Sequence, residues 1–258
     1  MHPIAFELGA LKIHWYGIMT ALGFLCALGI MQLRRKHCKM SAGEISDFMF
    51  MLIISGVLGA RIFYVIQFWD QFRDNLWEIV RIDHGGQVFY GGFLCSIIAI
   101  IIYCKRKKLS LVRVMDSSAP GLAFGHAVGR LGCFLNGCCF GAPTSCPIGV
   151  VYPEGSLPDR VYHGLALHPI QLYEASGNVI LSLILFYSIG KVKPGQTFSL
   201  YLIIYGVFRF VNEFFRGDHT DFIMGLTPAQ TLGIGIVATG IFFFTYFART
   251  KENVRTDL

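Results

Sequence analysis

Four arginines lie inside long apolar segments of this chain, where a charged group is costly and marks a candidate functional site. They are Arg61, Arg130, Arg209 and Arg216. Because a guanidinium forms two parallel hydrogen bonds with a phosphate, the chemistry that this set favours is phosphate recognition. One acidic residue, Glu213, is expected at the same depth, and one carboxylate does not neutralise four guanidiniums. We therefore expect an anionic ligand, such as a phospholipid head group, to balance the remaining charge.

Helical spacing places most of these side chains on two polar stripes. One stripe, in the segment YGVFRFVNEFFR, consists of Tyr205, Arg209, Glu213 and Arg216. The other, around the stretch GRLGCFLNGCCFG, consists of His126, Arg130, Cys133 and Gly137. Residues three or four apart share a helix face, and polar stripes within a membrane face the bundle interior or a cavity. In a purely structural alternative, Arg209 pairs with Glu213 and Arg61 extends to the membrane surface.

The composition of the chain indicates whether it folds in water or in a membrane. Of the 258 residues, 54% are hydrophobic and 15% are charged, whereas soluble domains have about 25% charged residues. Seven apolar runs are long enough, or nearly so, to cross about 30 Å of hydrocarbon. They are expected at about 14–33, 47–68, 88–104, 113–136, 172–190, 197–215 and 227–247, the fourth interrupted by DSSAPG at 116–121. These runs predict an all-α membrane protein of about seven transmembrane helices, with residues 1–258 in a single domain.

Basic residues predict the orientation, because they collect in cytoplasmic loops. Clusters follow the first, third, fifth and seventh runs: RRKHCK at 34–39, KRKK at 105–108, KVK at 191–193 and RTKENVR at 249–255. The amino terminus is then outside, the carboxyl terminus is cytoplasmic, and the four arginines fall in the outer half of the membrane. The net charge of +6 reflects basic anchors beside anionic lipid, so no nucleic-acid partner is expected.

The segment 137–171 between two of the runs is expected to form an ordered cap on the outer side. At its start lies a group of cysteines: Cys133, Cys138, Cys139 and Cys146. A compartment outside the cytoplasm permits disulfides, so one or two disulfides that pin the cap are favoured. Free packing thiols are one alternative, and a metal site that includes His126 or His163 is another.

Several motifs together resemble the prolipoprotein diacylglyceryl transferase family. The family signature has the form GR-x-G-N-F-x-N-G-x-x-x-G, and GRLGCFLNGCCFG at 129–141 is similar to it. Further motifs occur in the order and spacing of the family: WYG at 15–17, GVLGARIFYV at 56–65, GG-x-x-FYGG at 85–92, HPIQLYE at 168–174 and YGVFRFVNEFFR at 205–216. The resemblance therefore covers nearly the whole chain.

The resemblance implies an enzyme of the bacterial plasma membrane with its site on the periplasmic or extracytoplasmic side. The implied reaction moves the diacylglyceryl group of phosphatidylglycerol to the lipobox cysteine of a secreted prolipoprotein and releases glycerol 1-phosphate. This is the first step of lipoprotein maturation, and the resemblance implies no cofactor and no metal. The alternative is a related membrane protein that binds an anionic phospholipid, or one that uses a different thiol acceptor.

The resemblance also implies roles for individual residues. Arg130 is implied to bind the phosphate, and Arg209, oriented by Glu213, is the second arginine of the site. Tyr16 and Tyr205 are implied to line the cavity. Further substrate contacts are expected from Arg61, Arg216, Cys133, Asn136, Gly141 and His168.

Two positions depart from the family pattern. Tyr90 stands where the pattern has a histidine proposed as the general base, and a tyrosine with an ordinary pKa of about 10 is a weak base near neutrality. Cys133 stands where the pattern has asparagine, which removes an amide able to hold the phosphate. Three hypotheses for the base stay open: Tyr90, positive charge alone acting on the substrate thiol, or one of the histidines His84, His126 and His168.

Overall fold

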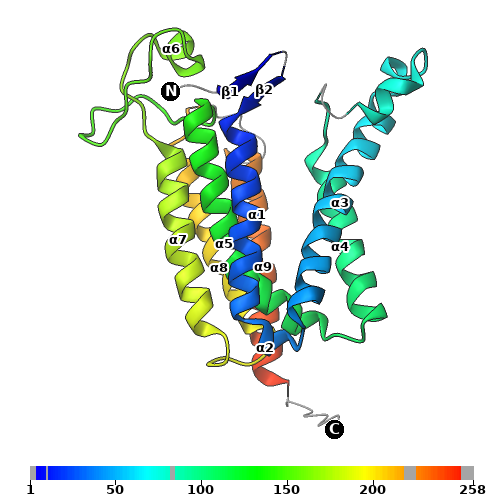
Figure 1. The fold of residues 1–258 in the computed structure, drawn as a ribbon. Helices are drawn as coiled ribbons and strands as arrows, with labels where there is room; N and C mark the ends of the chain where they lie inside the picture. The colour runs from blue at the N-terminus through cyan, green and yellow to red at the C-terminus, as the bar shows by residue number, and fades with distance from the viewer. Residues whose placement is uncertain (1–3, 10, 82–84, 218–224, 251–258) are drawn as a thin grey trace. The chain divides into compact units, whose positions relative to one another are not determined.

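The computed structural model describes residues 4–9, 11–81, 85–217 and 225–250. Seven helices of 18 residues or more occur in this part of the chain, within a few residues of the seven predicted runs (Figure 1). They are α1 (Trp15–Leu33), α3 (Ala42–Gln67), α4 (Phe89–Arg106), α5 (Leu111–Asn136), α7 (Ile170–Ser188), α8 (Gln196–Glu213) and α9 (Pro228–Arg249). Shorter elements are α2 (Arg35–Cys38), α6 (Leu157–Tyr162) and the 3-10 helices η1 (Trp69–Gln71) and η2 (Leu76–Val80).

Five of the long helices are apolar enough over their length to cross a membrane: α1, α3, α4, α7 and α9. The other two, α5 and α8, are equally long but carry buried polar side chains. These include Asp116 and Ser117 in α5, and Gln196, Thr197, Ser199, Asn212 and Glu213 in α8. The structure is therefore that of a mostly helical protein with several apolar helices of membrane-spanning length.

The amino-terminal segment differs from the all-α prediction. Strand β1 (Ile4–Leu8) pairs antiparallel with β2 (Leu11–His14) in a two-stranded hairpin. Its short strands lie ahead of the first apolar run, where the sequence shows no helical period. The sequence therefore predicted the helices correctly but did not predict this hairpin.

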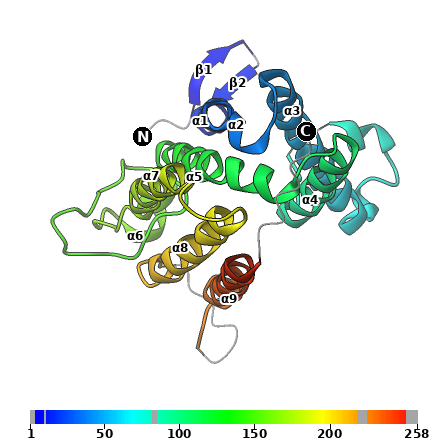
Figure 2. The ribbon, with the colours of Figure 1, turned by 90° about the horizontal axis from the view of Figure 1, so that it is seen from below.

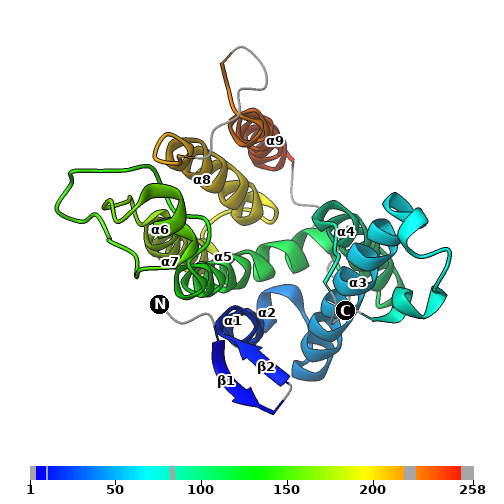
Figure 3. The same cartoon turned by 90° about the horizontal axis from the view of Figure 1, so that it is seen from above.

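The chain folds as two compact units, the first made of residues 1–34 and 115–258 and the second of residues 35–114. In the first unit α5, α7 and α8 share an apolar core, in which Ala119 and Ala123 meet Leu181 and Leu185. Tyr201 and other side chains of α8 pack against this cluster. Figures 2 and 3 show the three helices side by side, with α1 next to α5 and α9 next to α8.

In the second unit, α3 and α4 pack closely through small residues. A Cβ atom added at Gly59 would lie 2.7 Å from the Gly91 carbonyl oxygen, and one added at Gly92 would lie 2.7 Å from that of Gly56. Helix α3 begins with a capping box, in which the Ser41 hydroxyl accepts from the Glu44 amide and the Glu44 carboxylate accepts from the Ser41 amide. The two glycines of the FYGG motif thus serve helix packing.

The polar interruption DSSAPG does not break α5. The carboxylate of Asp116, which is 1% exposed, accepts hydrogen bonds from the backbone N–H groups of Gly195 (2.6 Å) and Phe198 (2.8 Å). It thereby caps the amino terminus of α8, whose first N–H groups have no partner within the helix. The Pro120 carbonyl accepts from the Ser182 hydroxyl of α7 at 2.8 Å. The polar residues of this stretch therefore tie α5 to its two neighbours.

We predict that Asp116→Ala lowers the free energy of unfolding by about 1–3 kcal/mol, because it leaves two buried N–H groups without an acceptor. The measurement is thermal unfolding of the detergent-solubilised protein. Asp74→Ala is the matched control, since the Asp74 side chain is 87% exposed. Equal unfolding midpoints for the two variants would show that the cap contributes nothing.

Candidate functional site

Arg130 forms a buried ion pair that joins two helices of the first unit. Its Nε atom on α5 faces the carboxylate of Glu174 on α7, and the exposed fractions of the two side chains are 16% and 3%. The same Nε donates a hydrogen bond to His126 Nε2 at 3.2 Å. A guanidinium has five N–H donors, and the two terminal nitrogens of Arg130 donate to none of the residues that the structure describes. They are therefore available to a ligand.

This pair corrects two expectations from the sequence. Glu213 is not the only carboxylate beside the arginines, and the charge of Arg130 is balanced by Glu174 rather than by a ligand alone. Glu174 lies in the second turn of α7 and is 2% exposed, so packing against α5 buries it. Apart from the ion pair, neither of its carboxylate oxygens has a hydrogen-bond partner among the described residues.

Arg209 belongs to a second charged group, at the end of α8. Its Nη1 atom lies 2.6 Å from Glu213 Oε2, which confirms the expected i,i+4 pair, and Arg216 Nε lies 3.9 Å from the same oxygen. The other Glu213 oxygen accepts from the Thr227 hydroxyl at 2.9 Å. Thr227 caps α9 in a capping box with Gln230. Glu213 therefore orients Arg209 and joins α8 to the start of α9.

Tyr205 and His126 lie between the two charged groups. Their ring centroids are 5.5 Å apart, and Tyr205 is within electrostatic range of Glu174, Arg130 and Arg209. His126 Nε2 accepts from Arg130, so its lone pair is occupied in this arrangement.

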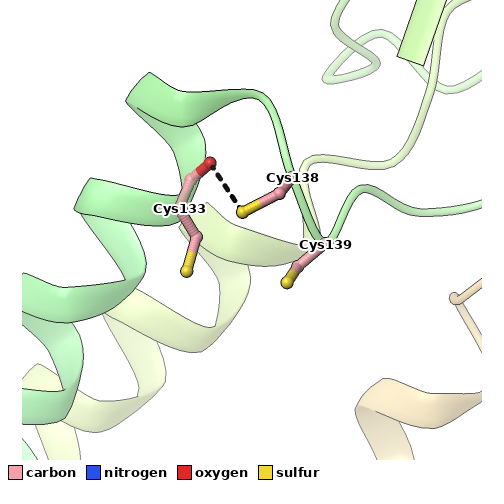
Figure 4. A group of neighbouring side chains, drawn as sticks. All are labelled: Cys133, Cys138 and Cys139. Carbon is pink, nitrogen blue, oxygen red and sulfur yellow. Dashed lines mark hydrogen bonds between the residues drawn. The ribbon is translucent and has the colours of Figure 1, made fainter. Parts of the chain in front are cut away.

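The signature stretch ends α5 with a Schellman turn. Gly137, with φ of +72°, donates its N–H to the Phe134 carbonyl at 3.2 Å, and the Cys138 N–H bonds to the Cys133 carbonyl at 3.1 Å. This left-handed position suits glycine, which has no Cβ to clash. The turn folds Cys138 back over Cys133, as Figure 4 shows.

Of the four cysteines between residues 133 and 146, the structure brings three together as thiols. The sulfur atoms of Cys133, Cys138 and Cys139 all lie within 4.8 Å of one another, whereas Cys146 is exposed and stands outside the group. All eight cysteines lie in the described residues and all are free, so the disulfides favoured from the sequence are not formed. Hydrogen bonds with the thiols of Cys133 and Cys139 lower the pKa of the Cys138 thiol, and Asn136 adds a further one.

The cap is anchored to the first turn of α7. The Gln171 side chain donates to the Cys138 carbonyl at 2.7 Å and accepts from the Tyr152 hydroxyl at 3.2 Å. Burial raises the pKa of the Tyr152 hydroxyl. At Gly141 an added Cβ would lie 2.7 Å from both the His168 and Phe215 carbonyl oxygens. The last glycine of the signature is thus required by close packing.

The remaining predicted site residues occupy varied environments. His168 Nδ1 lies 3.1 Å from the Tyr173 hydroxyl. Tyr16, on α1, is half-exposed and within electrostatic range of the three thiols. Tyr90 belongs to the second unit, where it lies in the first turn of α4 and is 70% exposed. His84 lies outside the described residues.

Arg61 has a different environment from the one that the sequence suggested. Its guanidinium makes five hydrogen bonds of 2.5–3.0 Å to backbone carbonyls. The acceptors are Glu78, Ile79, Arg81, Gly85 and Gly86. These bonds use the donor capacity of the side chain. Arg61 therefore holds the segment between α3 and α4 and has no donor left for a phosphate.

Sequence reasoning missed three residues that shape the site: Glu174, Gln171 and Thr227. The signal for Thr227 was readable, because T-x-x-Q before an apolar run is a capping-box pattern. The signal for Glu174 was weaker, since its burial depends on how α7 packs. Nothing in the local sequence pointed to the double role of Gln171.

Comparison with known proteins identifies the relatives of this chain. Residues 3–246 match the family model described as prolipoprotein diacylglyceryl transferase. A phosphatidylglycerol–prolipoprotein diacylglyceryl transferase of Clostridium tetani is 37% identical over 95% of this chain and 97% of its own length. Proteins of the same name from Finegoldia magna and Bordetella bronchiseptica are 33% and 35% identical, over 100% and 96% of this chain and 99% and 95% of their own lengths.

Proposed function

Because this chain belongs to the prolipoprotein diacylglyceryl transferase family, we propose that it carries out the reaction named for its relatives. It transfers the diacylglyceryl group of phosphatidylglycerol to the lipobox cysteine thiol of a secreted prolipoprotein and releases glycerol 1-phosphate. Among the residues, Arg130 supports this function most directly, because its ion pair with Glu174 leaves its two terminal nitrogens as donors. Two parallel N–H donors match the oxygens of a phosphate.

The donors of the site support a phosphodiester substrate. Glu174 and Glu213 hold the guanidiniums of Arg130 and Arg209, and the phosphate of phosphatidylglycerol carries one negative charge that the terminal nitrogens of Arg130 can bind. Charge-assisted hydrogen bonds of this kind are about twice as strong as neutral ones.

The transfer requires a carbon–sulfur bond to form as a carbon–oxygen bond breaks. The thiolate of the prolipoprotein attacks the carbon of the diacylated glycerol that bears the phosphate ester, the bond from that carbon to the ester oxygen breaks, and glycerol 1-phosphate leaves with a second negative charge on its phosphate. Arg130 and Arg209 stabilise that developing charge, because donors fixed in advance act strongly in a site without water. Glu174 and Glu213 keep the two guanidiniums in place.

The remaining predicted contacts belong to this proposal. Tyr16 and Tyr205 line the path of the lipid head group, and Arg216 adds positive charge beside Glu213. Contacts to the substrate from the signature and its surroundings are proposed for Cys133, Asn136, Gly141 and His168. Arg61 is left out of the binding set, because its donors are occupied by backbone carbonyls.

We propose seven spans in a bacterial plasma membrane, with the amino terminus and the arginine site on the extracytoplasmic side. Basic clusters follow α1, α4, α7 and α9, and these are alternate ends of successive helices. Both substrates are accessible on that side, since prolipoproteins are secreted and phosphatidylglycerol is a membrane lipid. Glycerol 1-phosphate is then released to the same side.

The direct test combines purified protein, phosphatidylglycerol vesicles and a lipobox peptide. We expect release of glycerol phosphate with a mass increase of one diacylglyceryl group on the peptide thiol. Arg130→Ala should lower kcat by about 10²–10³-fold, the usual loss when one charge-stabilising group is removed. Arg73→Ala is the matched control, because the Arg73 side chain is 61% exposed. Lipid binding without product, or transfer only to another thiol, would favour the two alternative functions instead.

Glu174→Gln should reduce kcat by about 10–100-fold, because the amide preserves volume but no longer holds Arg130 in place. It should also lower the free energy of unfolding, because the charge of Arg130 stays buried without its partner. We expect kcat to fall by a larger factor than KM rises, since the terminal nitrogens of Arg130 are still present to bind the phosphate. Glu154→Gln, at an exposed position in the cap, is the control. Equal turnover in the two variants would remove the positioning role of Glu174.

Tyr90 stays the candidate acceptor for the thiol proton. If it acts as the general base, Tyr90→Phe lowers kcat by about 10²-fold or more, and we expect this loss at neutral pH. Tyr187→Phe serves as the control, since Tyr187 is also exposed. A pH–rate profile identical to that of the unmodified enzyme would exclude Tyr90 and leave ionisation of the thiol to the arginines alone or to one of the histidines.

A further inference from the structure

Apart from the substrate contact proposed for Cys133, the proposed reaction gives the thiols at the end of α5 no role. Cys133 lies on the last turns of that helix, while Cys138 and Cys139 follow the Schellman turn. Figure 4 shows the three side chains grouped together where the helix meets the loop. Their sulfur atoms all lie within 4.8 Å of one another. Cys139 has a left-handed backbone conformation, with φ of +59°, that residues other than glycine rarely adopt. The backbone is thus arranged so that three thiols converge.

From this convergence we propose that Cys133, Cys138 and Cys139 form a binding site for one thiophilic d10 cation, Zn²⁺ or Cu⁺. Thiolates are the ligands that both ions prefer. With metal–sulfur bonds of about 2.3 Å, three sulfur ligands lie about 3.8–4.0 Å apart. The present separations therefore need to close by less than about 1 Å.

The surroundings of the thiols favour a bound cation. Cys133 is buried, whereas Cys138 and Cys139 are only partly buried, so an ion has a route to the group. Arg130 is within electrostatic range of Cys133 and Cys139, so its positive charge offsets part of the net negative charge that three thiolates around one Zn²⁺ or Cu⁺ carry. Binding releases the three thiol protons to solvent, so affinity falls as the pH is lowered.

The bound ion has a structural consequence. Cys138 is already tied to the cap, because its carbonyl accepts from the Gln171 side chain at 2.7 Å. A metal shared by the three thiols cross-links the end of α5 to the loop that follows. It thereby restrains the turn that carries Asn136 and Gly137. Zn²⁺ leaves a fourth position for water, whereas Cu⁺ is satisfied by three sulfurs.

A single disulfide is the main competing use of these residues. It would join two of the sulfurs at about 2.05 Å and leave the third unpaired. A disulfide needs only two sulfur atoms, so the convergence of three favours a metal site. Thiol counting in the protein isolated without reductant separates the two cases directly.

The test uses the full-length protein in detergent, reduced and stripped of metal with a chelator. Titration with Co²⁺, followed by displacement with Zn²⁺, should show sulfur-to-metal absorption that saturates at one ion per chain. A parallel titration with Cu⁺ from a competing chelator distinguishes the two ions. These readouts do not involve turnover, so they stand or fall independently of the transferase reaction.

Cys138→Ser and Cys139→Ser should each weaken binding by at least about 10-fold, while Cys146→Ser should leave it unchanged because that thiol lies outside the group. As a measurement without variants, Zn²⁺ should protect these three cysteines from alkylation in the intact protein, as mapped by mass spectrometry. Absence of binding to the reduced protein would overturn the proposal. Unchanged binding in both serine variants, or a disulfide within the group with no metal uptake after reduction, would do the same.

Discussion

A buried arginine must be neutralised where it lies, and the arrangement of the first unit depends on how Glu174 does this for Arg130. Both side chains are largely removed from solvent, so each pays a desolvation penalty that is recovered only in the presence of the other. Removing one partner of such a pair typically costs about 3–5 kcal/mol, because the other charge stays buried. The pair therefore fixes α5 against α7. It also determines which N–H groups of the guanidinium remain to bind a substrate.

Helix α5 shows the same requirement along its whole length. Near its start the Asp116 carboxylate caps α8, in its middle the Pro120 carbonyl accepts from Ser182 of α7, and further on Arg130 pairs with Glu174. Each of these polar groups lies in an apolar bundle and finds its partner on another helix. Unsatisfied polar groups are costly in such surroundings. The polar content that makes α5 less hydrophobic than its neighbours is thus what orders them around it.

The signature turn serves two purposes at once. Its glycines permit a left-handed turn at Gly137 and a close approach of Gly141 to the His168 and Phe215 carbonyl groups. Its cysteines use the same turn to converge on one point, with Cys138 held to α7 through Gln171. Cys133 therefore adds a third thiol to this turn, one helical turn after Arg130.

The sequence by itself determined the seven long helices, the i,i+4 pair of Arg209 with Glu213 and the family, because these depend on apolar length, helical spacing and local motifs. It did not determine the partner of Arg130, the occupied donors of Arg61 or the state of the cysteines. Those depend on contacts between residues far apart in the chain: Glu174 meets Arg130 only when α7 packs on α5, and Arg61 meets carbonyls from a loop. A local sequence pattern identifies the charged residues of a site. Only the tertiary structure decides which of these residues form ion pairs with one another.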